Sequence, residues 1–160
     1  MSRVSQPSTS GGGKLPADAV AAVQAALGAE HAALWVYGLV SAFLPDSFNA
    51  PVNEGNTAHR ARRDATERLL ADGGATPRPA EPAYVPPQPV TDQKSALAVL
   101  VVAESDTTVA WRAVLERTDD KFVRRAALEA LTAAAVRATR WRRAAGQAPA
   151  APAFPGAPGK

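Results

Sequence analysis

The chain has 160 residues, of which 46% are hydrophobic and 21% charged, so it is large and apolar enough to form one buried core. It contains no cysteine, which excludes a disulfide framework and a thiolate metal site. Its net charge of +3 and pI of about 9.7 permit contact with nucleic acid or an acidic partner without requiring it.

Both ends of the chain are predicted to be disordered tails. Residues 1–15 are polar and rich in glycine, and residues 147–160 consist mainly of proline, alanine and glycine. Residues 1–14 carry no apolar segment typical of a signal peptide, and the longest apolar run, AALWVYGLVSAFL, is too short to span a bilayer. We therefore expect a cytoplasmic chain that does not bind a membrane, with one folded domain over residues 16–146.

A first long helix is predicted from Pro16 to Pro45. Proline is favoured in the first turn of a helix, and Asp18 complements the positive end of the helix dipole. Apolar residues then recur at alternating steps of three and four, as on one face of a helix. This stripe consists of Val20, Val23, Leu27, Glu30, Leu34, Tyr37, Ser41 and Leu44.

A second helix is predicted from Pro51 to Asp72, where Gly73 and Gly74 end it. The link before it, PDSFNAP, is so short that the first two helices must pack antiparallel. The inner face of the second helix is left open between two neighbouring stripes. One consists of Ala58, Ala61, Ala65 and Leu69, and the other of His59, Arg62, Thr66 and Leu70.

A proline-rich stretch without a helical pattern, GGATPRPAEPAYVPPQPV, follows the second helix. In an extended, polyproline-like conformation it reaches roughly 50 Å, at about 3.1 Å per residue. A helix of about 22 residues is only ~33 Å long. The stretch can therefore return the chain to the other end of the molecule, so that the second and third helices run parallel.

A third helix is predicted from a cap at Thr91 or Asp92 to about Thr118, and a fourth from the TDD sequence to Gly146. The link between them is very short, so they pack antiparallel. The inner stripe of the third helix is Leu97, Leu100, Glu104, Thr107, Trp111, Val114 and Thr118. That of the fourth is Val123, Ala127, Leu131, Ala134, Ala138 and Trp141. Four long helices with one long central connection predict an all-α, ferritin-like antiparallel four-helix bundle.

Two acidic residues, Glu30 and Glu104, occupy core positions midway along the first and third stripes. Burying an ionised carboxylate without a partner is costly or raises its pKa. Three compensations are open, namely a metal ion, an arginine side chain and a retained proton. We favour arginine, because a guanidinium binds a carboxylate through two hydrogen bonds. The candidate arginines are Arg62, Arg63 and Arg137.

The two histidines are expected to have different surroundings. His31 is adjacent to a core position, which predicts a half-buried side chain against a neighbouring helix. His59 is expected to point inward near Glu30, in a structural role.

Three stretches of the chain are similar to known proteins. GAEHAALWVYG, in which Tyr37 follows Glu30 by seven residues, is similar to the first helix of ferritin-like proteins. AHRARRDATERLL resembles their second helix, and VVAESDTTVAWRAVLE resembles their third. The chain thus resembles, over roughly residues 17–145, a ferritin-like four-helix-bundle family of unknown function that is common in actinobacteria.

Ferritin-like di-iron proteins hold metal with one Glu from each of two helices and a Glu-x-x-His motif from each of the other two. The resemblance therefore implies an iron or manganese site that uses Glu30, Glu104, Asp64 and His59. The second helix lacks the motif, since Ala61 and Asp64 stand in its place, and the inward positions of the fourth helix are alanine. We therefore predict a degenerate di-iron site, with no catalytic residue and no cofactor.

The favoured function is a non-catalytic binding or structural module that pairs as a homodimer through its first two helices. The first alternative is a metal-binding, oxidase-like protein that uses Glu30 and Glu104. The second is a basic nucleic-acid-binding accessory factor, in which arginines grip phosphate and Trp141 stacks on a base. These arginines are Arg137, Arg140, Arg142 and Arg143. Because they also complement the helix dipole, we do not expect a nucleic-acid partner.

Overall fold

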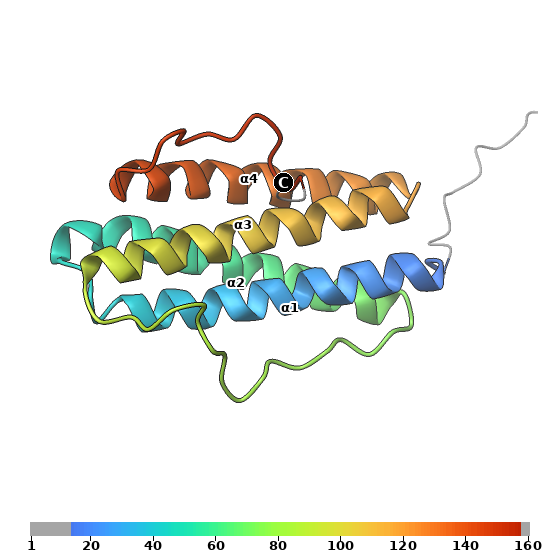
Figure 1. Ribbon diagram of the computed structural model, residues 1–160. Helices are drawn as coiled ribbons and strands as arrows, with labels where there is room; N and C mark the ends of the chain where they lie inside the picture. Colours follow the sequence, from blue (N-terminus) through green and yellow to red (C-terminus); the bar gives the residue numbers. More distant parts are fainter. Residues whose placement is uncertain (1–13, 158–160) are drawn as a thin grey trace, which may run out of the picture.

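The computed structural model describes residues 14–157 and contains four long helices, drawn in Figure 1. A single turn of 3-10 helix, η1 (Asp46–Phe48), lies between the first two. No strand occurs within the described residues, so the prediction of an all-α four-helix fold is confirmed. The helices are α1 (Ala17–Val40), α2 (Asn49–Asp72), α3 (Gln93–Arg117) and α4 (Lys121–Ala144).

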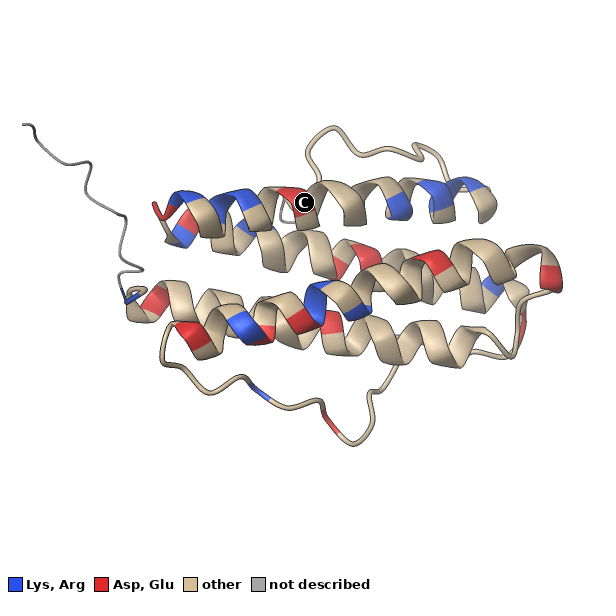
Figure 2. Cartoon of the chain, turned by 180° about the vertical axis from the view of Figure 1, so that it is seen from behind, with Lys and Arg blue, Asp and Glu red and all other residues tan. Residues whose placement is uncertain are grey.

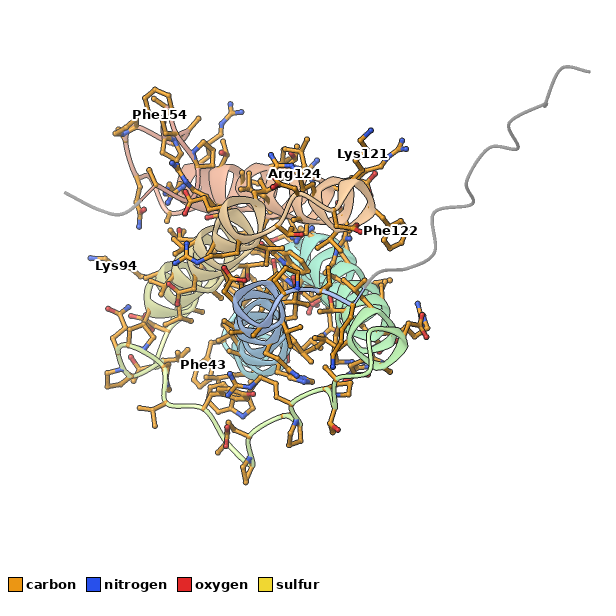
Figure 3. All side chains as sticks on the ribbon, turned by 90° about the vertical axis from the view of Figure 1, so that its right-hand side faces the viewer. Phe43, Lys94, Lys121, Phe122, Arg124 and Phe154 are labelled. Carbon is orange, nitrogen blue, oxygen red and sulfur yellow. The ribbon has the colours of Figure 1, made fainter. Side chains whose placement is uncertain are left out.

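The helices pack in the order α2, α1, α3, α4, because α1 contacts both α2 and α3 while α4 rests on α3. Figure 1 shows α2 and α3 running in the same direction, each antiparallel to its short-linked neighbour. Residues 75–92 join α2 to α3 without a helix. This linking segment passes over the outer side of α1, on the opposite side of the molecule from α4 (Figures 1 and 3).

The helix ends follow local capping chemistry. The Asp92 side chain accepts a hydrogen bond from the Ser95 backbone N–H at 2.8 Å, which caps α3 at one of the two predicted positions. The first helix ends at Val40 rather than Pro45. The backbone N–H of Phe43 bonds to the carbonyl of Val40, so the chain tightens into turns before the proline.

The core consists of two apolar clusters separated by a polar layer. The first, near the α1 C-terminus, includes Tyr37, Val40, Leu97, Leu100 and Trp141. The second, near the α1 N-terminus, includes Val23, Leu27, Leu70, Trp111 and Val114. Glu30, His59 and Glu104 lie between the two clusters along α1, α2 and α3 and are buried. All seven residues of the predicted α3 stripe are buried as well.

The structure selects one of the two candidate faces of α2. His59, Thr66 and Leu70 are buried, whereas Ala61 and Ala65 of the other stripe are exposed. The inner face of α2 is therefore the more polar of the two, which explains why hydrophobicity alone left it open.

Among the described residues, α1 is the one helix whose length and composition would allow it to cross a membrane. Core helices of soluble proteins meet the same test. Here α1 packs between α2 and α3 and carries a buried acid halfway along. A cytoplasmic location stays a prediction.

The C-terminal tail departs from the expected disorder over the part that the structure describes. Residues 147–157 fold back against α3 and α4, where Gly156 lies over the carbonyl of Thr108. The φ of +76° at Gly156 suits glycine, and no space remains there for a Cβ atom. The frequent prolines also reduce the entropy lost on ordering. Residues 1–13 and 158–160 of the predicted tails lie outside the described residues.

Candidate functional site

The polar layer brings together one side chain from each of three helices. Glu30 of α1, His59 of α2 and Glu104 of α3 are each no more than 1% exposed. Glu30 and Glu104 continue the inner stripes of their helices, and His59 lies on the inner face of α2 directly between them. Three of the four residues implied as metal ligands therefore converge at the centre of the bundle.

His59 bridges the two acids. Its Nδ1 lies 2.7 Å from Glu30 Oε2, and its Nε2 lies 3.0 Å from Glu104 Oε1. An ionised carboxylate only accepts hydrogen bonds, so with both acids ionised each ring nitrogen donates and the ring is an imidazolium. Burial lowers the pKa of His59, but the hydrogen bonds to Glu104 and Glu30 outweigh it and raise that pKa to about 9.

Glu104 receives the other cation of the layer. Its Oε1 accepts hydrogen bonds from Arg137 Nε at 2.8 Å and from Tyr37 Oη at 2.5 Å, besides the bond from His59. Burial raises the pKa of the Glu104 carboxyl, but His59 and Arg137 together bring it below its usual range. Its second oxygen, Oε2, is buried and has no hydrogen-bond partner among the described residues.

Two indoles close the network at its ends. Trp111 Nε1 donates to Glu30 Oε1 at 2.7 Å, and Trp141 Nε1 donates to the hydroxyl of Tyr37 at 2.8 Å. Burial and the neighbouring Glu104 raise the pKa of Tyr37, so its hydroxyl stays neutral and donates to the acid. We call Glu30, His59, Glu104, Arg137, Tyr37, Trp111 and Trp141 the buried network.

The charges of the buried network cancel. The carboxylates of Glu30 and Glu104 contribute two negative charges, and His59 and Arg137 contribute two positive ones. A buried ion pair is tolerated only when its members are paired and hydrogen-bonded, and here each ion has at least one charged partner. The network is thus a charge-balanced polar layer, in which one buried acceptor, Glu104 Oε2, has no partner among the described residues.

The remaining candidate residues lie elsewhere. Arg62 stacks over the ring of Trp111, 6.0 Å from its centroid, without reaching either acid. Arg63 pairs with Asp64, whose carboxylate is partly exposed and lies outside the buried network. His31 is buried rather than half-buried. Its Nε2 lies 3.2 Å from the carbonyl of Arg78 in the linking segment and 3.9 Å from Glu67 Oε1 of the neighbouring helix α2.

The basic residues of α4 gather toward its two ends, with an uncharged stretch and one acid between them (Figure 2). Near the C-terminal end, Arg137 bonds to Glu104, Arg140 to Glu54 of α2, and Arg142 to the hydroxyl of Ser105. Each of these three arginines thus has a partner within the bundle, and a nucleic-acid contact stays a prediction.

The residues present do not fit a di-iron site. Within residues 14–157, no three side chains of His, Asp or Glu are placed to hold one ion. Both ring nitrogens of His59 are taken up by the two acids, at 2.7 and 3.0 Å. Asp64, the fourth implied ligand, does not reach the layer.

The polar contacts of Tyr37, Trp111 and Trp141 were not predicted, although all three residues were expected in the core. Tyr37 follows Glu30 by seven residues, and Trp111 follows Glu104 by seven, so each donor shares a face with an acid. Because α1 and α3 are antiparallel, each aromatic residue binds the acid of the other helix. The repeated spacing, together with the need of a buried indole or phenol for a partner, is the signal that could have revealed them.

Comparisons relate the chain to proteins without an assigned function. The family described as "Domain of unknown function (DUF4439)" matches residues 22–159. Among solved structures, a conserved hypothetical protein, rv2844, from Mycobacterium tuberculosis is 39% identical in sequence, with a TM-score of 0.79. The match covers 86% of this chain and 97% of that one. No curated protein matches the chain.

Proposed function

The chain belongs to the DUF4439 family of domains of unknown function, and on that premise we propose that it is a ferritin-like bundle acting as a non-catalytic binding or structural module. The linking segment between two parallel helices supports the ferritin-like topology. In such proteins acids from facing helices and histidines hold two metal ions in the bundle core. In this chain, the buried network takes that position.

One observation carries the proposal, namely the double hydrogen bond of His59 to Glu30 and Glu104. A neutral histidine would offer a lone pair to a metal, whereas a charged histidine binds the acids themselves. Arg137 supplies the second positive charge, which a metal would otherwise supply. The module is therefore expected to fold and remain stable without metal.

Metal analysis tests the proposal. Protein purified without chelators should contain far less than one iron, manganese or zinc ion per chain. Its melting temperature should not change when EDTA, Fe²⁺ or Mn²⁺ is added. The opposite result would be one or more bound ions per chain in the wild type, absent from Glu104→Gln but present in Glu129→Gln. Glu129→Gln is the matched control, because it changes an exposed acid on α4 in the same way. That result would favour the metal-binding alternative.

We further propose that two copies pair, as ferritin-like modules often do. The linking segment covers the outer side of α1, so the exposed side of α2 would form most of the contact rather than both helices equally. Light scattering after size exclusion should give twice the mass of one chain at high concentration. A single-chain mass throughout would exclude the pairing.

A further inference from the structure

A hollow of about 160 Å³ lies between α1, α3 and the linking segment, on the side of α1 away from α2 and apart from the buried network. Small side chains create its floor, among them Ala29 and Ala32 of α1 and Ala103 of α3. An apolar cavity of roughly 150 Å³ in another protein is large enough to bind benzene. The hollow therefore fits a ligand with a body the size of one aromatic ring.

Two aromatic residues form part of the wall. The rings of Trp35 and Tyr84 have centroids 6.2 Å apart and are tilted by 55°. The hydroxyl of Tyr84 accepts a hydrogen bond from the Glu81 backbone N–H at 3.0 Å, which restrains the ring. Pro86 and Pro87 follow and limit the backbone of the same wall. Aromatic faces of this kind attract cations as well as apolar groups.

Among the described residues, Asp106 of α3 is the one charged residue that lines the hollow. Partial burial raises the pKa of its carboxyl. Neither a salt bridge nor a side-chain hydrogen bond involves Asp106 in the part of the chain that the structure describes, in contrast to Glu30 and Glu104. The hollow thus presents at its exposed edge a negative charge that pairs with no cation among residues 14–157.

We propose that this hollow is a binding site for a small organic ammonium ion with an apolar body. The body fills the alanine-lined floor, the ammonium group pairs with Asp106, and the Trp35 and Tyr84 rings pack against the ligand. This proposal names a ligand class for the binding module proposed above, and it rests on that proposed function. It does not depend on the buried network, so metal analysis and the experiment below can fail separately.

The test compares two probes of nearly equal shape at pH 7 and low salt, where benzylamine is a cation and benzyl alcohol is neutral. Each is titrated into the full chain and followed by two-dimensional NMR of the backbone amides. Benzylamine should shift the amide signals of α1, α3 and residues 84–87. It should bind about 5-fold more tightly than benzyl alcohol, because an exposed ion pair contributes at most about that factor to affinity.

Two variants separate the charge from the cavity. Asp106→Asn keeps the shape and should abolish the preference for benzylamine, while Ala32→Leu fills the floor and should weaken both probes. Asp119→Asn, which changes an acid between α3 and α4 away from the hollow, should leave both affinities unchanged. Equal binding of the two probes, a preference that survives Asp106→Asn, or amide shifts confined to other regions would overturn the proposal.

Discussion

At the scale of single residues, His59 decides the character of the interior. Its two ring nitrogens join acids from two different helices, so the side chain acts as a positively charged bridge. Hydrophobic patterning placed both acids in the core but could not name their partners. Glu104 has an arginine partner, Arg137, as favoured from the sequence, whereas Glu30 is bound by His59 and Trp111.

Replacing His59 by alanine should be strongly destabilising. The change leaves two buried carboxylates, Glu30 and Glu104, and only one buried cation, Arg137, which pairs with Glu104. Breaking a buried ion pair costs about 3–5 kcal/mol. His31→Ala is the matched control, because His31 is also buried but lies outside the buried network, 3.2 Å from a backbone carbonyl and 3.9 Å from the partly exposed acid Glu67. Urea unfolding should show a loss of only about 1 kcal/mol for this control. Similar losses in the two variants would contradict the bridging role.

The free energy of unfolding should fall as the pH rises from 6.5 to 9. The pKa of His59 is about 9 in the folded chain against 6.5 for a free side chain. A raised pKa means that the stabilisation is complete below pH 6.5 and is lost as the pH approaches 9, by about 3 kcal/mol. Urea unfolding at several pH values checks this. His31→Ala should keep the decline, and His59→Gln should lack it; a flat wild-type profile would refute it.

At the scale of the helices, α1 and α3 contribute equivalent sets of residues. Each carries an acid followed seven residues later by an aromatic hydrogen-bond donor, and their antiparallel packing crosses the two sets. The sequence was sufficient to predict the helices and the stripe of α3, whose seven residues are all buried. The stripe of α1 was predicted in part: Val23, Leu27, Glu30 and Tyr37 are buried, whereas Ser41 is exposed and follows the end of the helix. The inner face of α2 could not be chosen from its pattern, since its buried residues include a histidine and a threonine.

The close approach of α2 to α1 can be tested by substituting two glycines, Gly55 at the contact and Gly38 away from it. A Cβ atom at Gly55 of α2 would overlap the ring of Tyr37, whereas a Cβ at Gly38 of α1 would meet nothing within 4 Å. Gly38→Ala should therefore raise the free energy of unfolding by roughly 0.5–1 kcal/mol, from helix propensity alone. Gly55→Ala should lower it, because Tyr37 must move from Glu104 and Trp141. Thermal or urea unfolding of the two variants should give opposite signs, and a stabilising Gly55→Ala would argue against this packing.

At the scale of the whole molecule, the bundle consists of two apolar clusters joined by a neutral polar layer. The number of helices, their order and the inward placement of two acids could be predicted from the sequence. The composition of the layer could not, because it depends on which side chains of three other helices reach Glu104 in space. His59 stands two residues before Ala61, where the ferritin-like motif was sought, and its ring lies between the two acids.

The neutrality of the layer predicts strong coupling between Glu104 and Arg137. Glu104→Gln and Arg137→Met each leave an unbalanced buried charge, and each should cost several kcal/mol. The double variant restores a neutral layer, so its cost should be smaller than the sum of the two single costs by at least about 1 kcal/mol. Urea unfolding of the four proteins supplies the cycle. Additive costs would mean that the two side chains do not share a charge balance.

The most direct test of the central claim is the protonation state of His59 in the wild-type protein. Long-range ¹H–¹⁵N NMR of the imidazole rings reports whether each nitrogen carries a hydrogen. With His31→Ala used to assign the signals, both nitrogens of His59 should remain protonated at pH 7.5 and lose a proton only near pH 9. A neutral ring at pH 7.5, with one nitrogen free or bound to a metal, would contradict the account.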